Sequence, residues 1–526
     1  MNRRQFLQIT GSAAACAGAG FWSSSAHTQS GSVDASAVLT PEVVLAGPPR
    51  GPWRRLFLDA AVVEATDGLA RVFHAAEKRP TPVITRDKPW EGVSAITGPY
   101  VYGTAFWDGG KLRMWYEVHN KGTHTGYAES RDGITWTKPD LGIIEFEGSK
   151  ANTLVISAFQ REVTGGQCHN ASVIKCPWAS DPAKRYALYG FDTGSGHARV
   201  AFSPDGLHWR YAPETEKKPL FTSSDVVNFF WDAYHSRYAV TWKSRNRRGR
   251  AVGIAWSQDG LTWTKPIDGP VFVADDLDPD ATQIYGMPVF PYQGLYVGLP
   301  WPYNARYFKY GEYSVKKLHE AQEDSPRTMD TQLAWSWDLI NWTRPPERAQ
   351  FIPRGAKGAW DGGMICTARA PVIVGDQLFF YYGGCDGVHD EPRVNAAIGL
   401  ATLRLDGFCS MRAGEHEGWF ISRREPFRTP QVTINAKTAS DGYVTAEILD
   451  RRNRVMPGFA RQDCIPFTGD SVRHVLKSKS TGFQARDLDA DKKIRFWLKN
   501  TDLYSYLPNQ LTPQTDETGQ NRTAGP

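Results

Sequence analysis

Short runs in which hydrophobic and polar residues alternate fill most of the chain, and turn residues join many of these runs in pairs. One pair spans 103–116 and reads Gly-Thr-Ala-Phe-Trp-Asp-Gly-Gly-Lys-Leu-Arg-Met-Trp-Tyr; another spans 227–242. A period of two residues is that of a β-strand, whose successive side chains point to opposite faces. Two such runs separated by a turn predict a β-hairpin. The pattern therefore predicts an all-β protein.

A short motif, Ser-x-Asp-(Gly)-x-x-Trp, recurs between these runs. Its four copies begin at Ser130, Ser203, Ser257 and Ser336, and the last copy lacks the glycine. Asp and Gly favour a tight turn in which the carboxylate accepts hydrogen bonds from free backbone N–H groups, and the Trp covers the turn. Each unit then reads as strand, hairpin, strand, longer loop, strand, turn and strand, which predicts a four-stranded sheet.

A fifth unit keeps the strands without the turn motif, at 370–382 and 396–403. Sheets arranged radially leave only short exposed edges, which is the solution of a β-propeller. We therefore expect a five-bladed β-propeller over 50–406; a stack of β-sandwiches is the alternative. From 407 to 507 the alternating runs continue without the motif and predict a small C-terminal β-sandwich. The polar segment 508–526 has no periodicity and predicts a disordered tail.

The N-terminus indicates export. Paired arginines, Arg3 and Arg4, precede Phe6-Leu7, and an Ala- and Gly-rich stretch ends in small residues near position 26. This order is that of a twin-arginine signal peptide, predicted over 1–26 and followed by a linker over 27–49. Lipidation at Cys16 is the alternative to cleavage. Either way, we expect a periplasmic or extracellular protein.

The distribution of charged and apolar residues limits the possible partners. The net charge is +5 and the basic residues are dispersed, apart from one cluster at 243–250 that we interpret as a solvated hairpin loop. We therefore expect no nucleic acid partner. No segment after the signal reaches about 18 apolar residues, so no membrane span is expected. The oligomeric state stays open.

Six cysteines remain outside the signal, and none forms a CxxC pair. A zinc site of that kind is therefore not expected, and no metal ligand set is predicted. Cys168 with Cys176 and Cys366 with Cys385 are close enough in sequence to form disulfides in an exported protein, but buried free thiols are the simpler interpretation. No cofactor is expected. A Ca²⁺ ion beside the acidic run 275–280 is the alternative, although the run lacks the spacing of an EF-hand loop.

Several segments resemble the five-bladed glycosidases of glycoside hydrolase families 32 and 43 and a broader set of exported relatives. They are 56–59, 73–78, 114–116 with the first turn motif, 360–364, 386–390 and the predicted sandwich. The resemblance implies a glycoside hydrolase that cleaves oligo- or polysaccharides with a pair of carboxylates, one as proton donor and one as base or nucleophile. The Asn-Asp-Pro-Asn-Gly and Glu-Cys motifs of family 32 invertases are absent, which argues against fructosidase activity.

Candidate catalytic carboxylates follow from position. In a propeller, ligands bind at one mouth of the central channel, close to where the innermost strands begin. Asp225 and Asp361 each precede such a strand and come from blades two apart, so they are the leading pair. Glu117 and Asp59 are held in reserve. Each of the four could instead cap a turn or form an ion pair.

Other polar and aromatic residues at these positions are candidates for binding the sugar: His169, Asn170, Asn228, Tyr285, Trp360, Arg369 and His389. The histidines could donate to sugar hydroxyls or be structural. Arg369 could bind the carboxylate of an acidic sugar or form an ion pair inside blade five.

The turn motifs themselves are not candidates for catalysis. They resemble the Asp-boxes of sialidases, which are structural, and the Arg triad and Tyr nucleophile of a sialidase cannot be assigned. Two other functions remain open beside hydrolysis: a carbohydrate-binding propeller without catalysis, and a protein-interaction scaffold.

Overall fold

Strands make up almost all of the regular structure, as the alternation predicts. The structure, a computed structural model, describes residues 40–508 apart from 49, 93–95, 280–281, 305–326, 390, 426, 428–430 and 480–491. The predicted signal peptide, nearly all of the linker and residues 509–526 of the predicted tail lie outside the described residues. In the part described, the α-helices are α1 (Pro41–Ala46), α2 (Arg161–Thr164) and α3 (Glu214–Lys217), and the 3-10 turns are η2 (Ala60–Val62), η3 (Pro182–Lys184) and η4 (Arg461–Asp463). None of these described helices has the length and apolar character of a membrane span.

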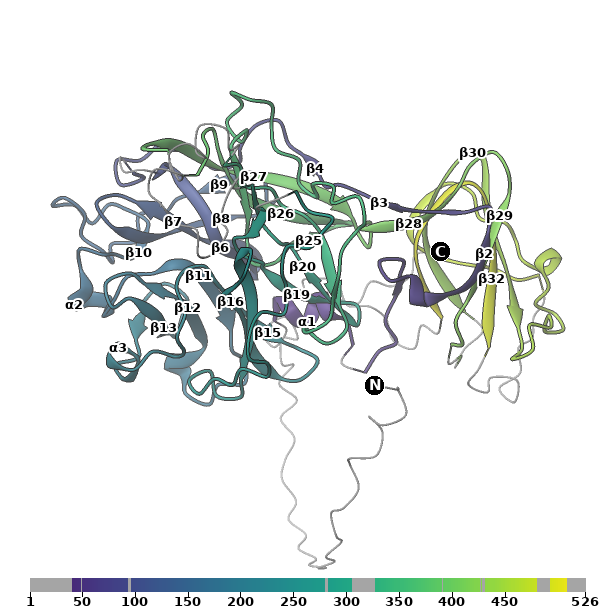
Figure 1. Ribbon diagram of the computed structural model, residues 1–526, viewed down its shortest axis with the longest axis horizontal. Helices are drawn as coiled ribbons and strands as arrows, with labels where there is room; N and C mark the ends of the chain where they lie inside the picture. The colour runs from purple at the N-terminus through teal and green to yellow at the C-terminus, as the bar shows by residue number, and fades with distance from the viewer. Residues whose placement is uncertain are drawn as a thin grey trace, which may run out of the picture. The chain divides into compact units, whose positions relative to one another are not determined.

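Five sheets form the blades of a β-propeller (Figure 1). Blade one contains β6 (Pro99–Asp108), β7 (Lys111–His119), β8 (Thr123–Ser130), β9 (Trp136–Thr137) and β10 (Leu154–Ile156). Blade two contains β11 (His169–Lys175), β12 (Tyr186–Asp192), β13 (His197–Ser203) and β14 (Arg210–Tyr211). Blade three contains β15 (Val227–Asp232), β16 (Arg237–Asn246) and β17 (Gly249–Ser257). Blade four contains β19 (Val289–Tyr292), β20 (Leu295–Gly298), β22 (Ala334–Ser336) and β23 (Trp342–Thr343).

Blade five draws strands from two parts of the chain. It contains β24 (Met364–Thr367), β25 (Val372–Val374), β26 (Gln377–Cys385) and β27 (Val394–Arg404). Its outer edge is β4 (Glu77–Lys78), which pairs with β27, and β5 (Ile96–Thr97) also pairs with β27. A separate short pair joins β18 (Thr282–Ile284) to β21 (Pro302–Asn304). The ring is thus closed by a segment that precedes blade one in the sequence.

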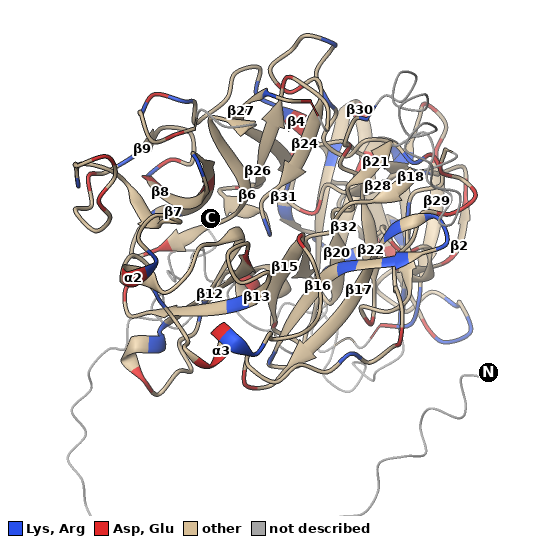
Figure 2. Ribbon diagram, turned by 60° about the vertical axis from the view of Figure 1, so that its left-hand side comes forward, with Lys and Arg blue, Asp and Glu red and all other residues tan. Residues whose placement is uncertain are grey.

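Both faces of a blade are buried, which explains why hydrophobic side chains occupy odd and even positions along a strand such as β7. On β7, Met114 and Tyr116 pack with residues of blade five such as Tyr381. Trp115, which points to the other face, packs with residues of blade two such as Val173. The period of two therefore places alternate side chains in two different interblade cores. Figure 2 shows the blades side by side in a second view.

The turn motifs are structural, as predicted. In the first copy, the Asp132 carboxylate accepts from the backbone N–H groups of Ile134 and Thr135, each at 2.8 Å. The turn carbonyl of Gly133 accepts from the Tyr381 hydroxyl of the neighbouring blade at 2.8 Å. The other three copies hold their Asp carboxylates in the same way. These carboxylates are occupied by local N–H groups, and in the first copy the Gly133 carbonyl ties the turn to the adjacent blade.

The C-terminal region forms an eight-stranded sheet rather than a unit separate from the N-terminal residues. Its strands are β1 (Arg55–Leu56), β2 (Val63–Asp67), β3 (Ala70–Phe73), β28 (Cys409–Ala413), β29 (Gly418–Ser422), β30 (Val432–Leu449), β31 (Asp470–Val475) and β32 (Lys493–Pro508). The predicted boundary at residue 50 therefore needs correction, because 55–73 pair with this sheet and not with a blade. Strands as short as β1, with two residues, and β3, with four, carry too little of the alternating pattern to reveal a partner strand that is distant in sequence.

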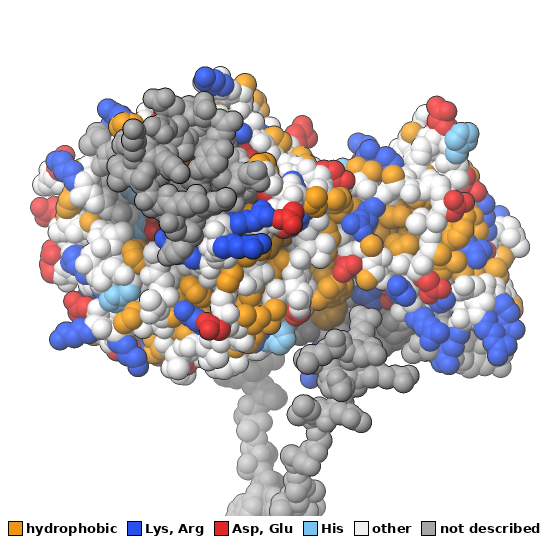
Figure 3. Space-filling model, viewed as in Figure 1, with side chains coloured by type: hydrophobic (Ala, Val, Ile, Leu, Met, Phe, Trp, Pro, Cys, Tyr) orange, Lys and Arg blue, Asp and Glu red, His pale blue; other side chains and the backbone are white. Residues whose placement is uncertain are grey.

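All six cysteines of the described residues are free thiols, so neither suggested disulfide forms. Five of them are buried, which raises their pKa and favours the uncharged thiol. Charges on the outside are mixed: Lys and Arg lie among Asp and Glu over the face seen in Figure 3. The acidic run is neutralised within the described residues, because Asp275, Asp276 and Asp278 pair with Arg348, Arg248 and Arg344. A Ca²⁺ site is therefore not supported at these three aspartates; Asp280 lies outside the described residues.

Candidate active site at the propeller mouth

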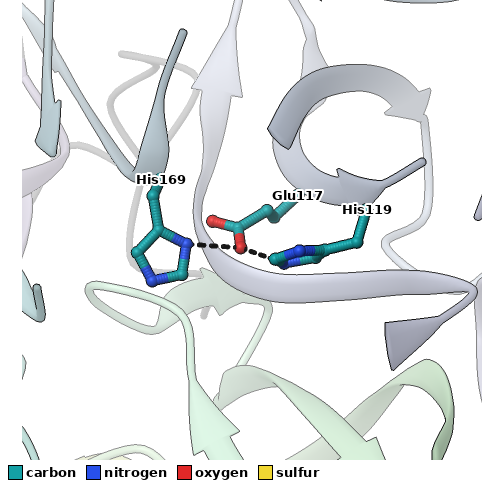
Figure 4. A group of neighbouring side chains, drawn as sticks. All are labelled: Glu117, His119 and His169. Carbon is teal, nitrogen blue, oxygen red and sulfur yellow. Dashed lines mark hydrogen bonds and ion pairs between the residues drawn. The ribbon is translucent and has the colours of Figure 1, made fainter. Parts of the chain in front are cut away.

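Polar side chains gather at the end of the propeller axis where the innermost strands begin, which we call the mouth. Glu117 on β7 lies at their centre and is 2% exposed. Its Oε1 accepts from His119 Nε2 at 2.5 Å and from His169 Nδ1 at 2.7 Å (Figure 4). Its Oε2 accepts from the backbone N–H of Asn170 at 2.7 Å. One buried carboxylate thus joins blades one and two.

Local geometry explains why these side chains meet. Glu117 and His119 are two residues apart on one strand, so they share a face. His169 is the first residue of β11 in the next blade. Asn170 follows with a φ of 67°, in the left-handed region that Asn tolerates better than most residues. Its side-chain Oδ1 accepts from the backbone N–H of Val227 at 2.8 Å, which ties β11 to β15.

The charges within this group are fixed by mutual contact. Burial alone would raise the pKa of Glu117, but the two histidines outweigh it and lower the pKa to about 2. Burial alone would lower the pKa of His169, but Glu117 and Asp225 outweigh it and raise the pKa to about 10. At neutral pH, therefore, Glu117 is a carboxylate and His169 an imidazolium.

Asp225 continues the chain of contacts toward solvent. His169 Nε2 lies 3.3 Å from Asp225 Oδ2, and Lys243 Nζ lies 3.3 Å from Asp225 Oδ1. These partners hold the pKa of Asp225 well below its usual range, although burial opposes them. The Asp225 side chain is 37% exposed, against 1% for Glu117. Asp225 is therefore the carboxylate of this group that a ligand can reach.

An aromatic and basic wall adjoins Asp225. Lys243 Nζ lies 4.4 Å from the ring centre of Tyr285, and the guanidinium of Arg250 lies 5.3 Å from it. Burial, opposed by Asp225, lowers the pKa of Lys243 to about 8. The Tyr285 hydroxyl lies 3.3 Å from His389 Nε2. We call Glu117, His119, His169, Asp225, Lys243, Tyr285 and His389 the mouth cluster.

Sequence reasoning found part of this cluster. The structure brings together the predicted residues Glu117, His169, Asn170, Asp225, Tyr285 and His389. It adds His119 and Lys243, which the sequence analysis missed. A signal for His119 was available, because it is two residues from Glu117 on a predicted strand. Lys243 was grouped with a basic loop, although it belongs to β16.

Comparisons with known proteins find similarity only among solved structures. No family model matches the chain, and no curated protein matches it. Among solved structures, a glycosyl hydrolase from Bacteroides ovatus matches with a TM-score of 0.43 and 16% identity, covering 63% of this chain and 94% of that one. Another match is described as a glycoside hydrolase, with a TM-score of 0.41 and 16% identity over 62% of this chain and 92% of that one.

Two further matches have the same character. One is from a study of the GH130 family of mannoside phosphorylases, described as containing glycoside hydrolases that target β-1,2 mannosidic linkages in Candida mannan; its TM-score is 0.42, with 15% identity over 63% of this chain and 94% of that one. The other is a fructofuranosidase from Schwanniomyces occidentalis, with a TM-score of 0.39 and 10% identity over 81% of this chain and 96% of that one. At such identity the likeness concerns the fold.

Asp361 has charge and hydrogen-bond partners of its own in blade five, which corrects the prediction that it forms a catalytic pair with Asp225. Its Oδ2 accepts from Lys78 Nζ at 2.6 Å and from the Tyr382 hydroxyl at 3.0 Å, and the residue is 3% exposed. Lys78 belongs to β4, the outer strand that closes the ring. Trp360 stacks on Tyr382 with ring centres 5.7 Å apart. Both residues therefore stabilise blade five rather than line the mouth.

Arg369 is a structural residue further along the axis. Its guanidinium donates to the Glu42 carboxylate of α1 and to the backbone carbonyl of Val173, and both ion-pair partners are buried. The alternative of an ion pair inside blade five is wrong, because the carboxylate partner comes from the N-terminal helix. An Arg whose charge is already neutralised by a buried Glu does not suit an acidic sugar.

Asp59 and Asn228 are not among the residues of the mouth cluster. Asp59 caps the turn η2 through the backbone N–H of Ala61 at 2.8 Å, and it accepts from the indole of Trp337. Asn228 is buried on β15 opposite Thr241 of β16. A hollow of about 330 Å³ lies elsewhere, between residues 71–75 and blade four, and contains one carboxylate, that of Glu347. The mouth cluster thus remains the candidate site.

Proposed function

We propose that the protein is a glycoside hydrolase whose substrate binds at the mouth beside Asp225. The observation that supports this is one carboxylate, partly exposed and held ionised by His169 and Lys243. Glycoside hydrolysis uses such a carboxylate as base toward water or as nucleophile toward the anomeric carbon. Tyr285, whose ring lies against Lys243 and Arg250, completes the wall beside Asp225.

In this proposal each neighbour has a separate task. Asp225 is the catalytic residue. His169 and Glu117 are positioning residues, since Glu117 orients the imidazole that holds Asp225. Lys243 keeps Asp225 ionised from the other side. Substrate oligosaccharide would enter from the exposed side of Asp225.

The experiment uses aryl glycosides and a panel of plant, algal and fungal polysaccharides with the wild type and Asp225→Asn. We expect the variant to lose about 10²- to 10⁴-fold in kcat while keeping its Tm. Asp205→Asn is the matched control, because Asp205 has a similar exposed fraction, 43%, but sits in a turn motif of blade two. Full turnover by Asp225→Asn would refute the assignment.

Binding without cleavage is the second candidate, and one observation favours it. Glu117, the second carboxylate of the mouth cluster, is buried with a pKa lowered to about 2, which makes it a poor proton donor. Calorimetric titration with the same oligosaccharides separates the two functions. Binding without any turnover would support this candidate, and no binding on a glycan array would favour an interaction scaffold.

We also propose export by the twin-arginine route, on the order of residues 1–26. Replacing Arg3 and Arg4 by Lys should leave the protein in the cytoplasm in a fractionation experiment. Release of the wild type without its first residues, as read by mass spectrometry, would support cleavage; a lipid on Cys16 would support the alternative.

A further inference from the structure

Three potential metal ligands converge at the mouth. One ring nitrogen each of His119 and His169 and a Glu117 carboxylate oxygen all lie within 4.8 Å of one another. Both imidazole nitrogens face the same oxygen, Oε1 of Glu117 (Figure 4). We propose that Glu117, His119 and His169 bind one divalent transition-metal ion.

The distances suit this with a small movement. Metal–nitrogen and metal–oxygen bonds of about 2.0–2.2 Å place neighbouring ligand atoms about 3.4 Å apart in a tetrahedral site. The two nitrogens lie 2.5 and 2.7 Å from the oxygen, so each N–O separation would widen by less than about 1 Å, and the two imidazoles, which flank this oxygen, would turn toward a common ion. His119, at 22% exposed, is the ligand with room to do so.

The surroundings already hold the ligands as a metal site requires. A ligating histidine usually donates its other ring N–H to a carboxylate, which fixes the tautomer. His169 meets this condition, since its Nε2 faces Asp225 Oδ2 at 3.3 Å. Glu117 is oriented by the backbone N–H of Asn170 on its second oxygen. On metal binding, the Nδ1 proton of His169 would pass to solvent, and neutral His119 would coordinate through Nε2 with its single ring proton on Nδ1.

The ligand types select the metal. Two imidazoles and one carboxylate suit Zn²⁺, Fe²⁺ or Ni²⁺, whereas Ca²⁺ and Mg²⁺ prefer oxygen ligands. Three protein ligands leave a coordination position for water or substrate, as in catalytic rather than structural zinc sites. The sequence did not predict this site, because the ligands come from two blades and follow no compact motif. The inference goes beyond the proposed function, since metal binding requires no sugar.

The test measures metal directly in the full chain, without substrate. Chelator-treated protein is dialysed against Zn²⁺, and bound metal is counted by mass spectrometry. We expect one Zn²⁺ per wild-type chain, and an affinity at least about 100-fold weaker in His119→Ala. His119 is chosen because it is partly exposed, so the variant should fold. His416→Ala is the control, since His416 is exposed outside the cluster and its loss should change nothing.

A second measurement guards against adventitious binding. Co²⁺ in place of Zn²⁺ should give visible absorption bands from nitrogen and oxygen ligands in the wild type, absent in His119→Ala. Asp225→Asn, which keeps all three ligands, should weaken Zn²⁺ binding about 10- to 100-fold. Failure to bind Zn²⁺, equal binding by His119→Ala, equal loss in His416→Ala, or a preference for Ca²⁺ would each overturn the proposal. Because neither measurement uses a glycan, a negative result for metal binding is distinct from a negative result for hydrolase activity.

Discussion

At the scale of single residues, His169 shows how two carboxylates can set one charge. Its imidazolium lies between Glu117 and Asp225, and its pKa is raised from 6.5 to about 10. The folded protein therefore binds more protons at this residue than the unfolded chain above pH 6.5. Stability from His169 is complete below pH 6.5 and is lost as pH rises toward 10.

This gives a prediction for pH 6.5 to 8. The free energy of unfolding of the wild type, relative to His169→Gln, should fall with pH by at most about 1.4 kcal/mol per unit. Lys243, whose lowered pKa acts in the opposite sense above pH 8, is present in both proteins, so its contribution largely cancels in the difference. Urea unfolding at several pH values in a chelator measures the difference. A difference that rises with pH in this window would contradict the assigned charge.

At the scale of elements, α1 contributes a buried ion pair to the innermost strands. Glu42 and Arg369 are 0% and 3% exposed in their side chains, and Arg369 also donates to Val173 of β11. Glu42→Gln would leave the Arg charge buried without its partner. We expect a loss of about 3–5 kcal/mol in the free energy of unfolding.

The double variant Glu42→Gln with Arg369→Met tests the cause. Removing both charges should recover part of the lost free energy of unfolding. The reason is that the loss comes from an unpaired buried charge and not from the missing contact with the helix. Equal stability of Glu42→Gln and wild type in urea would show that the pair contributes nothing.

The elements also show what local sequence can predict. The blades and turns were predictable because the strand period and the Asp132 turn use neighbouring residues only. Arg369 pairs with a residue 327 positions away, and Asp361 with one 283 positions away, so their partners left no local pattern. Most of the mouth cluster was predicted, because each strand start was visible in the sequence. Lys243 was missed because the direction of its side chain depends on the pairing of β16 with β17.

At the scale of the whole molecule, the ring is closed by residues that precede blade one. β4 pairs with β27, Val83 donates to the backbone carbonyl of Ile398 at 2.8 Å, and Lys78 pairs with Asp361 at 2.6 Å. β4 itself contributes only two residues, so its side-chain ion pair should carry much of this closure. Opening the ring should therefore affect blade five before the others.

Lys78→Met tests this closure. The change leaves Asp361, 4% exposed in its side chain, without its cation, so we expect a loss of about 2–4 kcal/mol. Hydrogen exchange should accelerate in β27 and β24 before it does in blades two and three. Lys111→Met is the control, since Lys111 and Glu129 are 42% and 28% exposed and their pair should matter by less than about 1 kcal/mol. Equal acceleration in all five blades would mean that the ring opens as one cooperative unit, and that closure by β4 is not its weakest point.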